Sequence, residues 1–209
     1  MKDNLFQLIS SNKASIFYYL STSGEDFKDN RKNILNLNTR LQDIKLETTT
    51  YKFDDFKTDS HYSLVANSIP SALNHIFSIY KPISRNEYKN ELLKIDYSPV
   101  KYLENKYRKI KDLFGIEKQI LLNDFRAVNA TIVKKKNMDY YKDLSKLAKD
   151  NYPGTLLSNL YIGRYYESTG NYKKAIKAYQ EAFVYDEIDG ITKEELLDRA
   201  EKLKFENDY

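Results

Sequence analysis

His61 stands in the segment "DSHYSL" and is one of only two histidines in the 209-residue chain. An imidazole acts as a general base when a carboxylate fixes its tautomer and stabilises its protonated form, as in Ser-His-Asp sites. Glu25 and Asp26, which follow the run "STSG", are the candidate acids. The pattern equally fits a simpler arrangement, in which His61 opens a helix beside Asp59 or Ser63 and the two acidic residues cap another helix.

Two predicted strands carry these residues to one edge of a sheet. The runs "SIFYYLSTS" (15–23) and "KLETTTYKFDDF" (45–56) are rich in aromatic and β-branched residues, which predicts strands. Apolar periodicity predicts helices over 26–44 and 63–80, with Pro70 either kinking the second helix or marking its first turn. The apolar face of that second helix consists of Leu64, Ile69, Leu73, Ile76 and Phe77. The order β-α-β-α implies parallel strands, so the loops that follow both strands meet at the same edge.

A nucleophile to complete such a site is not found in the sequence. Serine hydrolases of the α/β type carry their serine in the pattern G-x-S-x-G, on a sharp turn between a strand and a helix. No two of the six glycines bracket a serine at that spacing. Ser21, Ser23 and Ser60 lie near predicted loops but outside any such turn. We therefore expect the histidine and the acid to be present without their serine.

The carboxy-terminal half contains a helical repeat. In "NLYIGRYYESTGNYKKAIKAYQEAFVYDE", Gly163 and Ala175 allow two antiparallel helices to approach closely, and Gly170 suits the left-handed turn between them. The other recurring positions are Ile162, Tyr166, Tyr179 and Ala182. This spacing resembles the tetratricopeptide repeat family, whose period is 34 residues. The period indicates a divergent first repeat over 122–155 and a better second repeat over 156–189.

A final helix after the repeats is predicted by Thr192 and Glu195, which have the spacing of a capping box. The resemblance implies a concave, peptide-binding face. The positions expected to face that groove are Leu157, Leu160, Tyr161 and Arg164. They differ from the lysine and asparagine set of chaperone adaptors, and two repeats with a cap equally fit a packing appendage that binds no peptide.

The amino-terminal part has a resemblance of its own. The stretch from "IFYYLSTSGED" to "IPSALNHIFSIY" resembles the last two strand–helix units of esterases in the α/β-hydrolase superfamily, of the esterase D and ferri-enterobactin esterase-like group. His61, Pro70, Ala72, Leu73 and Phe77 stand at the places of the family's motif. The resemblance implies that His61 is the catalytic base and that Glu25 or Asp26 is its acid. Some bacterial members continue into a helical linker and tetratricopeptide repeats, which is also the order found here.

Composition limits the other functions. The chain has no cysteine, which excludes disulfides and zinc–thiolate sites. Its net charge of +4 arises from 34 basic and 30 acidic residues that are interleaved, so we expect neither nucleic acid nor membrane as a partner. No apolar run reaches the ~20 residues of a membrane span, and no signal peptide is recognisable at the amino terminus. Two histidines without metal-ligand spacing predict no metal site and no cofactor, and His75 suits a packed helix position. These features fit either the cytoplasm or the periplasm.

Together these patterns predict an α+β, mostly α chain. We expect the carboxy-terminal part of an α/β-hydrolase-like domain over 1–82, a helical linker over 83–119, and tetratricopeptide-like repeats with a capping helix over 120–209. The chain is predicted to supply the histidine and the acid of a serine esterase. It is expected to be inactive without the missing half of the hydrolase. The alternative is a protein–protein interaction or scaffold module. The amino-terminal unit is expected to pack against the linker, a second copy of the chain, or the missing hydrolase half, because a two-stranded parallel sheet leaves its edges and faces open.

Overall fold

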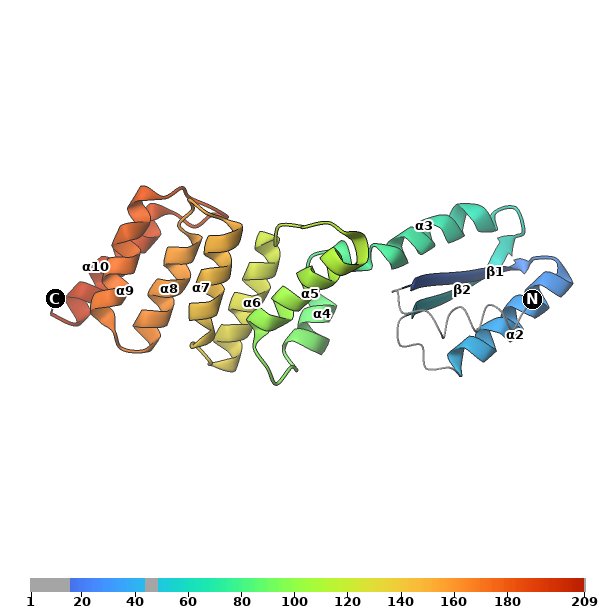
Figure 1. The fold of residues 1–209 in the computed structure, drawn as a ribbon, viewed down its shortest axis with the longest axis horizontal. Helices are drawn as coiled ribbons and strands as arrows, with labels where there is room; N and C mark the ends of the chain where they lie inside the picture. The colour runs from blue at the N-terminus through green and yellow to red at the C-terminus, as the bar shows by residue number, and fades with distance from the viewer. Residues whose placement is uncertain (1–15, 44–48, 209) are drawn as a thin grey trace. The chain divides into compact units, whose positions relative to one another are not determined.

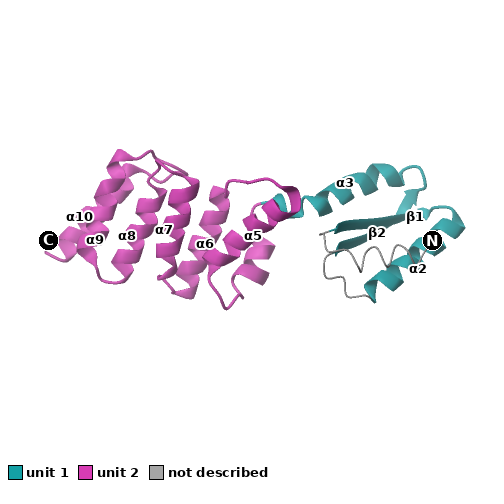
Figure 2. Cartoon of the chain, in the orientation of Figure 1, with its two compact units in different colours: residues 1–81 teal, residues 82–209 magenta. Residues whose placement is uncertain are grey.

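A computed structural model describes residues 16–43 and 49–208 of the protein. The chain divides into two compact units, Met1–Lys81 and Pro82–Tyr209, which Figure 2 colours separately. The segment 83–119, expected as a linker, lies within the second unit. The fold class is confirmed: a small parallel sheet is followed by an array of helices (Figure 1).

Among the described residues of the first unit, one parallel pair of strands is accompanied by two α-helices, drawn on opposite sides of the strands in Figure 1. Its elements are β1 (Ile16–Glu25), α2 (Lys28–Gln42), β2 (Thr49–Ser60), α3 (Leu64–Ile76) and the 3-10 helix η1 (Ser78–Tyr80). The parallel pairing predicted from the β-α-β-α order is confirmed. Both strands extend beyond their predicted carboxyl ends. Ser15 and the segment 45–48, which were also predicted as strand, lie outside the described residues.

Helix α3 begins well before Pro70, so the prediction that Pro70 lies in its first turn is wrong. Pro70 lies inside the helix, six residues after Leu64. The helix buries none of its residues fully within the described structure. Its large exposed apolar side chains, Val65, Ile69 and Leu73, recur every four residues, and the cap residue Phe77 continues the spacing. Val65, Ile69 and Leu73 thus give one face of α3 an exposed apolar stripe.

The second unit is helical throughout. Its elements are α4 (Arg85–Glu87), the π-helical turn η2 (Tyr88–Leu92), α5 (Pro99–Phe114), α6 (Leu122–Lys135), α7 (Tyr140–Asn151), α8 (Leu157–Ser168), α9 (Tyr172–Glu181), the 3-10 helix η3 (Ala182–Val184) and α10 (Lys193–Glu206). Local sequence sets several boundaries. The Ser98 hydroxyl caps α5 by accepting from the Lys101 amide, and Gly115 ends that helix in the left-handed conformation with φ 68°. Thr192 caps α10, its hydroxyl accepting from the Glu195 amide at 3.1 Å.

Helices α8 and α9 pack closely because a glycine stands where they meet. A Cβ atom on Gly163 would lie 2.1 Å from the ring of Tyr179, which is itself fully buried. Ala175 is fully buried as well, and Gly170 turns the chain between the helices with φ 72°. The small residues of the repeat pattern therefore have the packing role that their spacing predicts.

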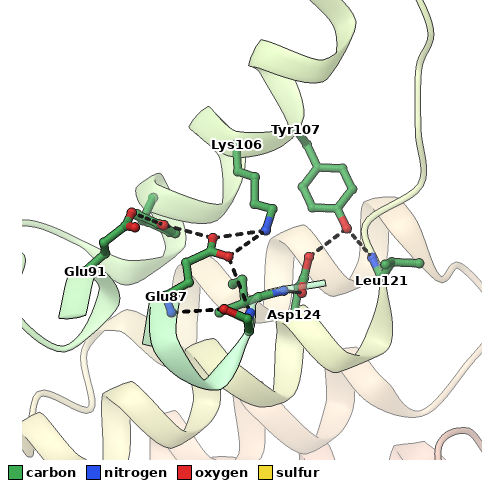
Figure 3. Close-up of polar contacts among 9 residues, drawn as sticks. Glu87, Glu91, Lys106, Tyr107, Leu121 and Asp124 are labelled. Atoms are coloured by element: carbon green, nitrogen blue, oxygen red, sulfur yellow. Dashed lines mark hydrogen bonds and ion pairs between the residues drawn. The ribbon is translucent and has the colours of Figure 1, made fainter. Parts of the chain in front are cut away.

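A buried polar network holds the start of this unit together (Figure 3). Asp124 on α6 is fully buried and accepts hydrogen bonds from the Ile83 amide at 2.6 Å and the Tyr107 hydroxyl at 2.8 Å. The same hydroxyl accepts from the Leu121 amide at 2.8 Å. Nearby, the ammonium group of Lys106 pairs with Glu87 at 3.0 Å. Each polar group of this network has a partner, as a stable interior requires.

The close packing at Gly163 gives a first prediction. The change Gly163→Ala forces an overlap with Tyr179, so we expect the free energy of unfolding to fall by about 1–3 kcal/mol even though alanine favours helix. Urea titration followed by far-ultraviolet circular dichroism measures it. Lys177→Ala, at an exposed position of α9, is the control and should stay within about 0.5 kcal/mol of the parent. Equal stability of Gly163→Ala and the parent would contradict the packing described.

The buried carboxylate gives a second prediction. The change Asp124→Asn keeps the shape but leaves one oxygen to accept from two donors, so the free energy of unfolding should fall by about 1–3 kcal/mol. The same urea titration applies, with Asp143→Asn on the exposed face of α7 as control. If both variants are as stable as the parent, the network does not stabilise the unit.

Candidate functional site

The register of the two strands brings the candidate acid and histidine together. The strands pair residue by residue up to Ser23 and Phe56, and then β2 runs two residues longer, so that Glu25 lies opposite Ser60. The next residues in each strand direction are Asp26 and His61. Their side chains meet there, with Nδ1 of His61 2.7 Å from Oδ1 of Asp26.

Gly24 permits the close crossing of the two strands beside this contact. A Cβ atom at that position would lie 1.8 Å from the backbone oxygen of Lys57, which excludes any other residue without a backbone shift. Arg31 of α2 adds a clamp, because its guanidinium donates to the Ser23 carbonyl at 2.7 Å and to both carboxylate oxygens of Asp55 at 2.8 and 3.0 Å. The helix that follows Asp26 is thereby fixed to the carboxyl ends of both strands.

Asp26 is buried and fully engaged. Its side chain is 4% exposed. Besides His61, it accepts from the Phe27 amide at 2.8 Å and from the Thr22 hydroxyl at 3.2 Å. Burial opposes ionisation, but the hydrogen bonds from His61, Phe27 and Thr22 outweigh it and lower the pKa of Asp26 below its ordinary value. Asp26 is therefore a carboxylate at neutral pH.

An ionised Asp26 determines the tautomer of His61. A carboxylate only accepts, so Nδ1 of the imidazole must carry the proton that it donates, and in the neutral ring Nε2 is left with its lone pair. Among the described residues, Nε2 has no hydrogen-bond partner. The ring is 38% exposed and lies between Phe27, at 4.5 Å between centroids, and Tyr62, at 5.4 Å. The arrangement presents a basic nitrogen beside two exposed aromatic rings.

The turn that carries His61 is closed by two serines. The Ser63 hydroxyl accepts from the Ser60 amide at 2.9 Å, and the Ser60 hydroxyl accepts from the Ser63 amide at 3.1 Å. Asp59, the other suggested partner of His61, instead accepts from the Asn67 side chain at 2.5 Å. The helix-opening alternative for His61, with a bond to Asp59 or Ser63, is therefore not what the structure contains.

The other candidates of this unit lie elsewhere. Glu25 is exposed, and Asp26 alone of the two acids contacts His61. His75 donates from Nε2 to the Thr50 carbonyl at 3.2 Å and packs edge-on against Phe17, which makes it a packing residue. The clamp residue Arg31 and the hydroxyl of Thr22 were missed, because nothing in their spacing distinguishes them from surface residues.

A groove crosses the second unit on the side formed by α6, α8 and α10. It encloses about 680 Å³ and is lined by Asn129, Val133, Met138, Tyr141, Arg164, Glu167, Ser168, Tyr172, Arg199, Leu203 and Glu206. Arg164 is the one predicted groove residue that lines it. The side chains of Leu157, Leu160 and Tyr161 are at most 3% exposed, so the expectation that they face the groove does not hold. Tyr161 instead stacks between Phe125 and Tyr141 in the core.

Within the described ranges 16–43 and 49–208, no group of three or more histidine or acidic side chains is placed to hold a metal ion. No helix in this part of the chain is both long and apolar enough to cross a bilayer.

Comparison with known proteins identifies a structural relative. No protein-family model matches the sequence, and no curated protein matches it significantly. The crystal structure of an uncharacterised protein from Capnocytophaga ochracea DSM 7271 is similar, with a TM-score of 0.85 and 30% sequence identity. The match covers 98% of this chain and 58% of that one, so the present chain spans little more than half of the relative's length.

The imidazole tautomer can be tested directly. Ring nitrogen shifts from NMR above neutral pH should show His61 with its proton on Nδ1, because Asp26 accepts it. Asp26→Ala should let the proton exchange between both nitrogens, whereas Glu25→Ala should change nothing. The unchanged resonances of His75, bonded to the Thr50 carbonyl, would verify that the unit stays folded. A proton on Nε2 of His61 in the parent would contradict the geometry.

Proposed function

We propose that this chain supplies the base and the acid of a serine hydrolase acting on carboxylic esters. His61 is the general base and Asp26 is the residue that orients it. The serine is supplied by polypeptide outside these 209 residues, either the same protein or a second chain. The observation that carries the proposal is the 2.7 Å contact between a buried carboxylate and Nδ1 of a histidine whose Nε2 has no hydrogen-bond partner among the described residues.

The geometry supports each step that we assign to His61 and Asp26, which together form the proposed catalytic dyad. Nε2 of His61 takes the proton of the attacking serine hydroxyl and later gives it to the leaving alcohol. Asp26 keeps the ring in the productive tautomer and stabilises the imidazolium between these steps. The location agrees as well, because ligands of open α/β sheets bind beyond the carboxyl ends of the strands.

Two further features fit a site completed by additional protein. The exposed apolar side chains Val65, Ile69 and Leu73 lie along one face of α3, and further hydrolase structure would cover them. The Capnocytophaga protein is longer than this chain, with 42% of its length outside the match. Alone, the dyad lacks a nucleophile and an oxyanion hole, so we expect no turnover by these residues by themselves.

The test is hydrolysis of p-nitrophenyl esters. The chain alone should hydrolyse them no faster than its His61→Ala variant. A polypeptide that joins this chain to the sequence encoded upstream of it should contain G-x-S-x-G and turn over, and His61→Ala should lower kcat by about 10⁶-fold. His75→Ala is the control and should retain activity. Activity that survives His61→Ala, or the lack of any such serine in the joined protein and its partners, would contradict the proposal.

A second candidate function is protein–protein interaction through the helical unit, in keeping with the tetratricopeptide resemblance. The observation that favours it is the groove of about 680 Å³, a size suited to side chains of a bound segment. Its test is selection from a displayed peptide library on the full chain. If no peptide is enriched, the interaction function is contradicted and the helices serve only to pack within the protein.

A further inference from the structure

Two exposed aromatic rings lie beside His61. The ring centroids of Phe27 and Tyr62 are 4.5 Å and 5.4 Å from that of the imidazole. Phe27 is 59% exposed and Tyr62 is 85% exposed. The other large apolar side chains that the described part of the first unit exposes lie along α3 and its cap. Phe27 and Tyr62 are therefore a separate group, located at the candidate base.

The backbone holds both rings at this edge of the sheet. Phe27 is the cap residue of α2, and its amide donates to Asp26 at 2.8 Å. Tyr62 follows His61 directly, in the turn that two serine hydroxyls close. The same two backbone segments thus carry the dyad and the rings. The rings keep their places beside the imidazole although neither is packed into the core.

The chemistry of ester cleavage decides which part of a substrate lies near these rings. In the proposed reaction the serine oxygen bonds to the ester carbonyl carbon, and the bond from that carbon to the alcohol oxygen breaks. The imidazolium of His61 then gives to the alcohol oxygen the proton that it took from the serine. That oxygen must lie within about 2.6–3.2 Å of Nε2 when the bond breaks. The alcohol part of the ester therefore lies beside the imidazole, while the acyl part stays on the serine.

The rings beside the imidazole are suited to an alcohol that is itself aromatic. Aromatic rings stack or meet edge to face at centroid separations of about 4.5–7 Å, and one such pair contributes about 0.5–1.5 kcal/mol beyond the burial of its area. A phenyl or benzyl group on the alcohol oxygen extends far enough from Nε2 to meet Phe27 or Tyr62, because both rings lie within 5.4 Å of the imidazole. Such contact would also cover two apolar side chains that are otherwise exposed.

We infer that Phe27 and Tyr62 are specificity-determining residues that select esters of aromatic alcohols, meaning phenols and benzyl alcohols. This inference rests on the proposed function, because it requires His61 to protonate the leaving alcohol. It concerns the alcohol part of the substrate alone.

The experiment compares two esters in the polypeptide that joins this chain to the sequence encoded upstream of it. Benzyl acetate and cyclohexylmethyl acetate share their acyl group and differ in whether the ring of the alcohol is aromatic. Each kcat/KM is divided by the rate constant for hydrolysis by hydroxide, which removes the difference in intrinsic reactivity. The parent should favour benzyl acetate by about 2- to 12-fold, the equivalent of one aromatic pair. Phe27→Leu and Tyr62→Leu should each lower that ratio, and the double variant should bring it close to one.

Two controls distinguish contact with the alcohol from a change in the fold. Phe183→Leu alters a phenylalanine of the second unit that is 57% exposed, nearly as much as Phe27, and it should keep the ratio of the parent. Ethyl phenylacetate and ethyl cyclohexylacetate differ only in their acyl part, so their ratio should not respond to Phe27→Leu or Tyr62→Leu. Because each readout is a ratio measured on one variant, a smaller folded fraction cancels out.

The possible results separate this inference from the function on which it rests. Hydrolysis that depends on His61 but has equal kcat/KM for the two acetates would overturn the inference, and the proposed function would stand. A ratio that changes only for the two ethyl esters would also overturn it, since the rings would then contact the acyl part. The same holds if the preference for benzyl acetate survives both substitutions. No hydrolysis of any of these esters would overturn both.

Discussion

The register of one parallel strand pair determines the candidate site. Strands β1 and β2 pair evenly up to Ser23, and the extra length of β2 then places Ser60 opposite Glu25. Asp26 and His61 follow at the same edge and form their 2.7 Å contact. The close crossing at Gly24 and the Arg31 clamp on Asp55 hold this geometry, so the dyad depends on backbone packing more than on its own two side chains.

The helical unit also depends on close packing at a glycine, here between two helices. Gly163 lets α8 lie against the Tyr179 ring, and that packing sets which faces of the helices are buried. Tyr161 turns inward onto Phe125, while Arg164, three residues later, turns into the groove. In each unit a glycine lets two backbone elements pack closely: Gly24 between the strands and Gly163 between α8 and α9. The candidate residues His61 and Arg164 are partly exposed beside these contacts.

Periodicity predicts elements better than it predicts contacts. The parallel pair, the helical array and the cap at Thr192 were predictable, because each rests on local residue spacing. The choice between Glu25 and Asp26 was not, since it depends on two extra residues in β2 that no local pattern reveals. Leu157, Leu160 and Tyr161 were placed in the groove incorrectly because helix rotation is decided by tertiary packing, here by aromatic stacking. The position of Pro70 inside α3 is a further case, in which the tertiary fold keeps a helix that proline disfavours.

The central proposal is that Nε2 of His61, which has no hydrogen-bond partner among the described residues, accepts the proton of a serine that lies outside them. The most direct measurement is the crystal structure of a longer polypeptide that joins this chain to the sequence encoded upstream of it. The account predicts a serine Oγ within about 2.6–3.2 Å of His61 Nε2, with Asp26 still bonded to Nδ1. A structure in which Nε2 is covered by apolar side chains, or in which every serine lies far from it, would contradict the account.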